Sequence, residues 1–292
     1  MALKQLQLTS RGEIKDKIEI AIDRLRNFEP EEGYYVAFSG GKDSQVIYHL
    51  CEMAGVKFDA HYSVTSVDPP ELIYFIRKHY PAVSFDTPHK NGKQVSMWSL
   101  IIERKLPPTR IVRYCCEKLK ECHGKGRITL TGVRWAESAN RRNNQGLVGI
   151  GTTSERAKRH ILENNDSAKL TPKGHLVLND DNDESRRIVE QCYRTYKMII
   201  NPIVDWEDED VWEYLNEVAQ VEHCCLYDEG MDRIGCIGCP MAGQQKREAE
   251  FERWPKYKEL YNKAFVRLFE ENPGRYKKWN TAEEMWKWWM EM

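Results

Sequence analysis

The feature that most constrains this chain is a glycine-containing turn between a buried strand and a helix. Residues 34–38 (YYVAF) are typical of a buried strand, SGGKDS follows at 39–44, and apolar residues at helical spacing then lead to Gly55. The pattern recurs less cleanly, with a strand expected over 56–65, a helix over 68–80 and a strand over 82–85. Alternating units of this length predict an α/β fold of three layers, a parallel sheet covered by helices on both faces.

The rest of the chain divides by its apolar periodicity. We expect helices over 12–28, 93–105, 111–120 and 205–218, and strands over 127–133 and 197–204. Over 143–190 the apolar residues lose their regular spacing, which predicts an irregular insertion or lid. The predicted domains are an N-terminal helix (1–29), a main domain (30–241) that carries the glycine turn and contains the insertion 143–190, and a helical C-terminal region (242–292).

Composition excludes several classes of protein. The chain has 292 residues, 41% hydrophobic and 30% charged, so it can bury a large core and is neither disordered nor fibrous. It contains no run of 18 apolar residues, and charges interrupt the segment where a signal peptide needs its apolar stretch. We therefore expect a cytoplasmic protein that does not associate with a membrane.

Charge is distributed unevenly along a nearly neutral chain. Residues 104–160 hold 14 lysines and arginines against four acidic residues, whereas 180–213 hold four against 11. A basic segment of this density suits a polyanion, either a nucleotide or a nucleic-acid backbone. The alternative is a solvated face balanced by acidic neighbours.

The turn at 39–44 carries the sharpest chemical signal. Its glycines let backbone N–H groups approach an anion, and the helix that follows presents its positive end. This arrangement suits a phosphate group. The competing interpretation is a tight connection in which Asp43 or Ser44 merely caps the helix.

In its strand-to-helix context, SGGKDS resembles the PP-loop of the adenine nucleotide α-hydrolase superfamily, whose members cleave ATP between the α and β phosphates. The resemblance implies that the loop surrounds the nucleotide phosphates and Mg²⁺, with Lys42 and Asp43 in catalytic roles. The implied loop residues are Ser39, Gly40, Gly41, Lys42, Asp43 and Ser44.

Further strings resemble the phosphoadenosine phosphosulfate reductase family over residues 34–135 and 197–241. They are YCCEKLK at 114–120, TGVRWAES at 131–138, NPIVDW at 201–206, DVWEYL at 210–215, LYDEG at 226–230 and GCIGCP at 235–240. Arg134 follows a predicted strand, where a phosphate or sulfate contact is expected, with a structural ion pair to Glu137 as the alternative. Asp68 falls where the superfamily contacts the nucleotide, although DPPE departs from the usual acidic-glycine string.

The chain has nine cysteines, many for a protein of this kind. In the iron-sulfur branch of the family, tandem cysteines and a CxxC together hold a [4Fe-4S] cluster, and the matching positions are Cys115, Cys116, Cys236 and Cys239. Adjacent helical residues diverge by about 100°, so the first two can serve one cluster only if the helix ends or distorts there. A zinc site of the same four residues is the alternative. Cys51 and Cys192 are predicted to be buried thiols.

Two departures from the reductases bear on function. A family reductase attacks sulfur with a cysteine near its C-terminus, but no cysteine follows Cys239, and the reductases carry a degraded phosphate loop. We therefore expect an ATP pyrophosphatase that adenylates its substrate and supports sulfur transfer. Nucleic acid is the acceptor that we favour. The sulfur donor would be a protein such as a cysteine desulfurase. The alternatives are a sulfonucleotide reductase using Cys224 or Cys225, and a non-catalytic nucleotide-binding iron-sulfur module.

Overall fold

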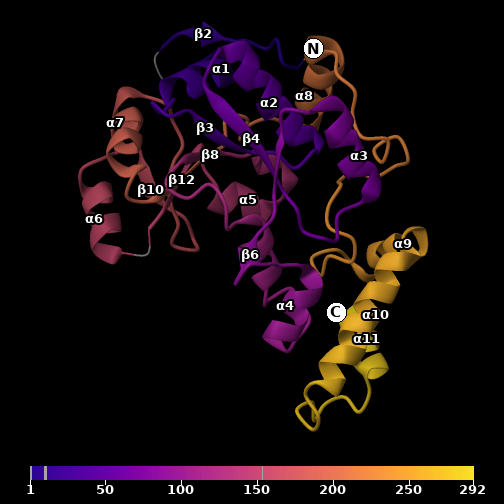
Figure 1. The fold of residues 1–292 in the computed structure, drawn as a ribbon. Helices are drawn as coiled ribbons and strands as arrows, with labels where there is room; N and C mark the ends of the chain where they lie inside the picture. The colour runs from indigo at the N-terminus through magenta and orange to yellow at the C-terminus, as the bar shows by residue number, and fades with distance from the viewer. Residues whose placement is uncertain (1, 10–11, 153) are drawn as a thin grey trace. The chain divides into compact units, whose positions relative to one another are not determined.

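The structure, a computed structural model, describes residues 2–9, 12–152 and 154–292 (Figure 1). It divides into two compact units, each made from several stretches of chain. The first unit contains residues 1–62, 75–84 and 124–224, and the second contains 63–74, 85–123 and 225–292.

The first unit is built on a sheet of eight strands in the order β10-β11-β9-β12-β8-β3-β4-β5. The strands β12, β8, β3 and β4 run parallel, and β9, β11 and β10 extend the sheet as antiparallel strands. Their bounds are β3 Tyr34–Ala37, β4 Phe58–Ser63, β5 Ser84–Asp86, β8 Ile128–Leu130, β9 Val148–Gly151, β10 Ala168–Leu170, β11 Leu176–Leu178 and β12 Lys197–Ile200.

Helices lie on both sides of this sheet, which confirms the predicted α/β class (Figure 1). They are α1 Lys17–Asn27, α2 Lys42–Ala54, α3 Pro70–His79, α5 Ala139–Asn144, α6 Glu155–Glu163, α7 Asp183–Cys192 and α8 Asp208–Glu213, which continues as a π-helix at Tyr214–Ala219. The helix after the glycine turn ends as predicted, because Gly55 adopts the left-handed conformation that closes a helix (φ 68°).

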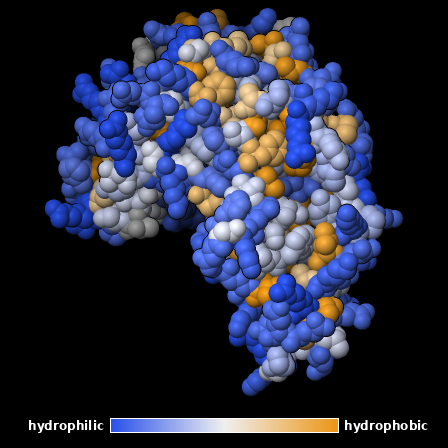
Figure 2. Space-filling view, viewed as in Figure 1, coloured by the Kyte–Doolittle hydropathy of each residue, from blue (hydrophilic) through white to orange (hydrophobic). Residues whose placement is uncertain are grey.

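The prediction of an irregular insertion over 143–190 is wrong. The segment forms α6, α7 and the three antiparallel strands β9, β10 and β11, with Val148, Leu176 and Leu178 buried. These strands have only three or four residues each, too few to give a readable alternation along the sequence. In the face seen in Figure 2, the polar sides of α6 and α7 cover the left of the surface.

Several predicted helices have different bounds in the structure. The helix predicted over 12–28 begins only at Lys17, because Asp16 caps it and Ile14 lies exposed in the short strand β2 (Ile14–Lys15), paired with β1 (Gln7–Leu8). In place of the helix over 93–105, the hairpin β6 (His89–Lys90) and β7 (Lys93–Gln94) precedes α4 (Met97–Arg104). The stripe expected over 205–218 is buried at Val211 and Leu215 but reaches the surface at Val218.

The second unit packs aromatic side chains between its C-terminal helices, α9 (Gln244–Arg253), α10 (Pro255–Glu270) and α11 (Ala282–Glu291). Phe251, Tyr261, Phe265 and Trp289 are buried and in ring contact with one another. Trp289 and these neighbours therefore form the core between the three helices. In the part of the chain that the structure describes, no helix is both long and apolar enough to span a bilayer.

An ion pair fastens α1 to the chain after β12. The Arg24 guanidinium donates to both carboxylate oxygens of Asp205, each at 2.8 Å, and to the carbonyl of Pro202. Burial opposes ionisation of Asp205, but the hydrogen bonds and charge of Arg24 outweigh it and hold the pKa of that carboxyl below its usual value.

We expect Asp205→Asn to lower the free energy of unfolding by roughly 1–3 kcal/mol at pH 7. A carboxyl with a lowered pKa stabilises the fold fully above its unfolded pKa of about 3.9, and the contribution disappears as the pH falls below that value. Urea unfolding of both proteins from pH 7 to 3 should therefore show the difference closing below about pH 4. Asp232→Asn, at an exposed position, is the control; an equal loss in that variant would refute the role of the pair.

Candidate functional site

The glycine turn lies where the order of the parallel strands reverses. The chain leaves β3 for β4 on one side and returns as β8 on the other, so β3 and β8 flank the switch point. Open α/β sheets bind ligands outside the carboxyl ends of their strands at such a point. Residues 38–41 after β3, 131–134 after β8 and 201–207 after β12 meet along this edge.

Hydrogen bonds within the turn hold its shape. The Ser44 hydroxyl donates to the carbonyl of Gly41 (2.8 Å) and accepts from the backbone N–H of Ser39 (3.1 Å). Gly40 adopts a positive φ of 73°, which glycine allows without strain. Gly41 is the N-cap of α2 and offers no side chain, so no cap side chain covers the positive end of this helix.

Arg134 lies at the centre of the site, 1% exposed. Its Nε donates to Asp43 Oδ1 (2.7 Å), its Nη1 to the carbonyl of Trp206 (3.2 Å) and its Nη2 to Asp208. Burial alone would lower the pKa of Arg134, but the charges of the two carboxylates outweigh that and raise it. The alternative pairing with Glu137 is not seen, because Glu137 pairs with Arg141.

Lys42 is also buried, and its ammonium lies 3.3 Å from Asp208 Oδ1. Two cations, Lys42 and Arg134, and two carboxylates, Asp43 and Asp208, therefore form one network at the sheet edge. Burial opposes ionisation of Asp208, but its pKa lies below the usual value because Arg134 donates to it and Lys42 adds positive charge.

Gly132 lets the chain after β8 approach the turn closely. A Cβ added there would lie 2.8 Å from the carbonyl carbon of Asp43 and 2.9 Å from its oxygen, closer than real Cβ atoms come. The missing side chain is therefore what allows the segment that carries Arg134 to pack against the loop.

We expect Gly132→Ala to displace the loop, with a loss of stability of about 1–3 kcal/mol. Gly149→Ala is the matched control, because its new Cβ would meet nothing closer than 3.9 Å. Thermal melting should be measured on both variants. Equal effects in the two would show that close packing at position 132 has no special importance.

The four predicted cysteine ligands all belong to the second unit. Cys115 and Cys116 lie where a helical turn becomes a π-helix, Cys116–Lys120, which is the distortion that a shared cluster requires of adjacent residues. The helix expected over 111–120 is thus confined to its last residues. Cys236 Sγ lies 3.7 Å from Thr65 Oγ1, and Thr65 also donates to Asp68 (2.6 Å).

Electrostatic interactions connect the four thiols. The pKa of Cys115 is raised by its hydrogen bond with Cys116, by burial, and by the charges of Cys116, Cys236 and Cys239. The same hydrogen bond, aided by Arg113, lowers the pKa of Cys116 to about 5. The four sulfurs therefore share one neighbourhood, although they come from distant parts of the sequence.

The four thiols are not arranged as the ligands of a metal ion. Across residues 2–9, 12–152 and 154–292, no three histidine, cysteine, aspartate or glutamate side chains are arranged so that they could hold a metal ion. Asp68 is buried in the second unit, where it accepts from the backbone N–H of Thr65 (2.8 Å), and its charge helps to raise the pKa of Lys120, after that of Cys236. The structure thus groups Asp68 with the cysteines, in a different unit from the phosphate loop.

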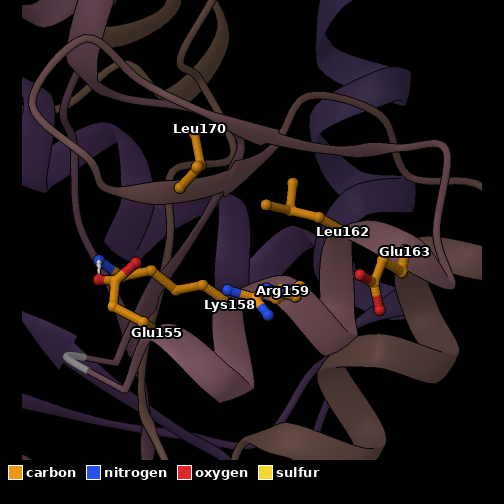
Figure 3. A pocket seen from close by; sticks show the side chains of 6 residues that line it. All are labelled: Glu155, Lys158, Arg159, Leu162, Glu163 and Leu170. Atoms are coloured by element: carbon orange, nitrogen blue, oxygen red, sulfur yellow. Dashed lines mark hydrogen bonds and ion pairs between the residues drawn. The ribbon is translucent and has the colours of Figure 1, made fainter.

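A surface pocket of about 300 Å³ lies elsewhere in the first unit, between α6 and β10 (Figure 3). None of the loop residues, nor Arg134, lines it. Its lining carries charges of both signs and two leucines, and it lacks a converging set of donors: Glu155, Lys158, Arg159, Leu162, Glu163 and Leu170. We therefore assign the candidate site to the sheet edge.

The structure brings Lys42, Asp43 and Arg134 together through Asp208 and the Arg134–Asp43 pair, and it adds two residues that the sequence analysis did not single out, Gly132 and Asp208. Asp208 lies between two of the quoted strings, in the segment that follows the parallel strand β12. Its position at the carboxyl edge of the sheet was the available signal.

A parallel sheet with a glycine loop at its switch point is the architecture of a nucleotide-binding α/β domain. The family model for the phosphoadenosine phosphosulfate reductase domain matches residues 33–242, and the chain belongs to this family.

Two curated relatives are uncharacterized proteins of Methanocaldococcus jannaschii. One is 30% identical over 237 residues, covering 78% of this chain and 45% of the relative. The other is 25% identical over 262 residues, covering 87% of this chain and 45% of the relative. The chain therefore spans a little under half the length of the curated relatives it matches.

Solved structures resemble the chain at the level of the fold. FMN adenylyltransferase of Candida glabrata aligns with a TM-score of 0.44 at 11% identity, covering 81% of this chain and 70% of that one. Phosphoadenylyl-sulfate reductase of Candida auris, in a phosphate complex, aligns with a TM-score of 0.42 at 15% identity, covering 74% and 87%.

Proposed function

We propose that the chain is an ATP pyrophosphatase that transfers the adenylyl group of ATP to an acceptor and releases pyrophosphate. The observation that carries the proposal is the buried cation pair at the sheet edge, Lys42 and Arg134, beside the uncapped N-terminus of α2. Burial strengthens the attraction of these cations for phosphate oxygens, and the helix end adds backbone donors.

Each residue then has a distinct task in the step. An oxygen of the acceptor attacks the α phosphorus, the bond to the bridging oxygen breaks, and pyrophosphate leaves with the electron pair. Lys42 and the loop amides would stabilise the charge on the departing pyrophosphate, and Arg134 would hold the loop through Asp43. The Asp43 carboxylate suits Mg²⁺, which prefers oxygen ligands and accompanies nucleotide phosphates.

We further propose that Cys115, Cys116, Cys236 and Cys239 hold a [4Fe-4S] cluster. Four thiols in one electrostatic neighbourhood and the π-helical turn support this, and the sulfurs must move closer together to ligate. A bound cluster would supply one-electron chemistry. Lys120 places positive charge beside Cys236, and Arg113 donates to Cys116 Sγ.

Sulfur transfer onto nucleic acid is the acceptor chemistry we favour, with a cysteine desulfurase or similar protein as donor. The basic segment 104–160 supports it, although residues 104–123 belong to the second unit and 124–160 to the first. We expect DNA or RNA binding to weaken at least tenfold between 50 and 200 mM salt, because counterions are released on binding. Binding that is absent or insensitive to salt would favour a small-molecule acceptor.

A sulfonucleotide reductase remains the second candidate because one further thiol is accessible. Cys225 is exposed, whereas Cys224 is buried. The test is to give the anaerobically purified chain either Mg-ATP or an adenylylsulfate, each with a dithiol as reductant, and to measure pyrophosphate and sulfite. Pyrophosphate supports the adenylating enzyme, and sulfite identifies the reductase. Binding of ATP without either product would indicate the non-catalytic module.

A further inference from the structure

The Lys42 ammonium already has an anionic partner in the nucleotide-free protein. The side chain of Lys42 is 7% exposed and lies 3.3 Å from Asp208 Oδ1, whereas the side chain of Asp208 is 58% exposed. The lysine is therefore enclosed by protein, and its partner borders on solvent.

Asp208 stands at the start of α8, directly after the N-cap Glu207. Besides Lys42, it contacts Arg134, so one carboxylate bridges both cations of the site. Arg134 keeps two other partners, Asp43 and the carbonyl of Trp206, which do not depend on Asp208. Loss of the Asp208 contact would therefore leave Arg134 anchored.

A phosphate that binds Lys42 competes with this carboxylate for the same ammonium. Two anions side by side on one cation repel each other, and the repulsion is strong where the surroundings are partly buried. Of the two partners, the side chain of Asp208 reaches solvent, whereas that of Lys42 is enclosed by protein. A phosphate on Lys42 would therefore displace Asp208, which would give up its contact with Arg134 as well.

We propose that Asp208 is a positioning residue that occupies the phosphate position on Lys42 in the empty site and is displaced when the nucleotide binds. This inference rests on the proposed function. In the empty site, Asp208 keeps the Lys42 ammonium in position without a bound phosphate. Because the carboxylate competes with the phosphate, it also weakens nucleotide binding. When pyrophosphate has formed, the returning carboxylate competes with it and aids its release.

The test compares Asp208→Asn with Glu209→Gln, which removes the same charge from an exposed position in the same helical turn. Calorimetry should use three probes: Mg-ATP, inorganic pyrophosphate and adenosine. We expect Asp208→Asn to bind ATP and pyrophosphate roughly tenfold tighter, since hydrogen bonds between charged groups have about this worth, and adenosine unchanged. Glu209→Gln should stay within about twofold of the unmodified chain.

Steady-state kinetics adds a readout that loss of structure would not produce. In Asp208→Asn the KM for ATP and the inhibition constant of pyrophosphate should both fall, with kcat held back by slower product release. If the unmodified chain binds ATP, but neither Asp208→Asn nor Asp208→Ala binds ATP or pyrophosphate more tightly than it does, the inference is overturned and the proposed function stands. An unmodified chain that binds neither ATP nor pyrophosphate would overturn the proposed function, and the inference with it.

Discussion

Replacing Lys42 with alanine is expected to lower the rate of pyrophosphate release by about a hundredfold or more. The substitution removes the ammonium at the open end of α2, and loss of one preorganised group that stabilises developing charge typically costs this much. A coupled pyrophosphate assay at saturating Mg-ATP measures the effect.

The control for this experiment is Lys158→Ala. Lys158 is a lysine of the same unit whose ammonium pairs with Glu155 on α6, away from the loop. Its activity should match that of the unmodified chain, and both variants should melt cooperatively. Turnover that survives in a folded Lys42→Ala protein would remove the loop from the chemistry.

Serine at any one of the four cysteines Cys115, Cys116, Cys236 and Cys239 is expected to abolish the visible absorption of the anaerobically purified protein. Iron and acid-labile sulfide should fall from about four of each per chain to well below one, because a cubane cluster needs all four thiolates. Local stability should fall as well, because the free energy of metal binding no longer stabilises the folded region.

Cys51→Ser and Cys192→Ser are the controls for the cluster. Cys51 is fully buried in α2 and burial raises its pKa, and Cys192 is half-buried at the end of α7. Both lie in the first unit, and both variants should keep their colour. A colourless protein with one zinc per chain after anaerobic preparation would replace the cluster with a structural zinc site and leave the loop assignment intact.

Local features of the sequence were sufficient to predict the loop. A buried strand, a glycine turn and a helix closed by Gly55 are set by neighbouring residues, and the structure has β3, the loop and α2 where the pattern places them. The apolar stripe of 205–218 was also readable at Val211 and Leu215, because helices of the core keep their hydrophobic period.

Features that depend on distant parts of the chain could not be read in the same way. Gly132 matters because β8 lies beside β3, and Asp208 matters because β12 follows β8 in the sheet. Of the short strands in 143–190, β9 pairs with β12, β11 pairs with β9, and β10 pairs with β11, and no local pattern reveals this pairing. The order of the strands in the sheet, rather than the local propensity of the sequence, therefore determines the structure at these positions.

The origin of the oxygen in the product tests the central claim most directly. In the absence of an acceptor, water slowly takes the adenylyl group, so the chain should convert Mg-ATP in ¹⁸O-labelled water to AMP and pyrophosphate. Attack at the α phosphorus, as the loop assignment requires, places the label in AMP and leaves pyrophosphate unlabelled. Label in pyrophosphate, or ADP and phosphate as products, would contradict the account.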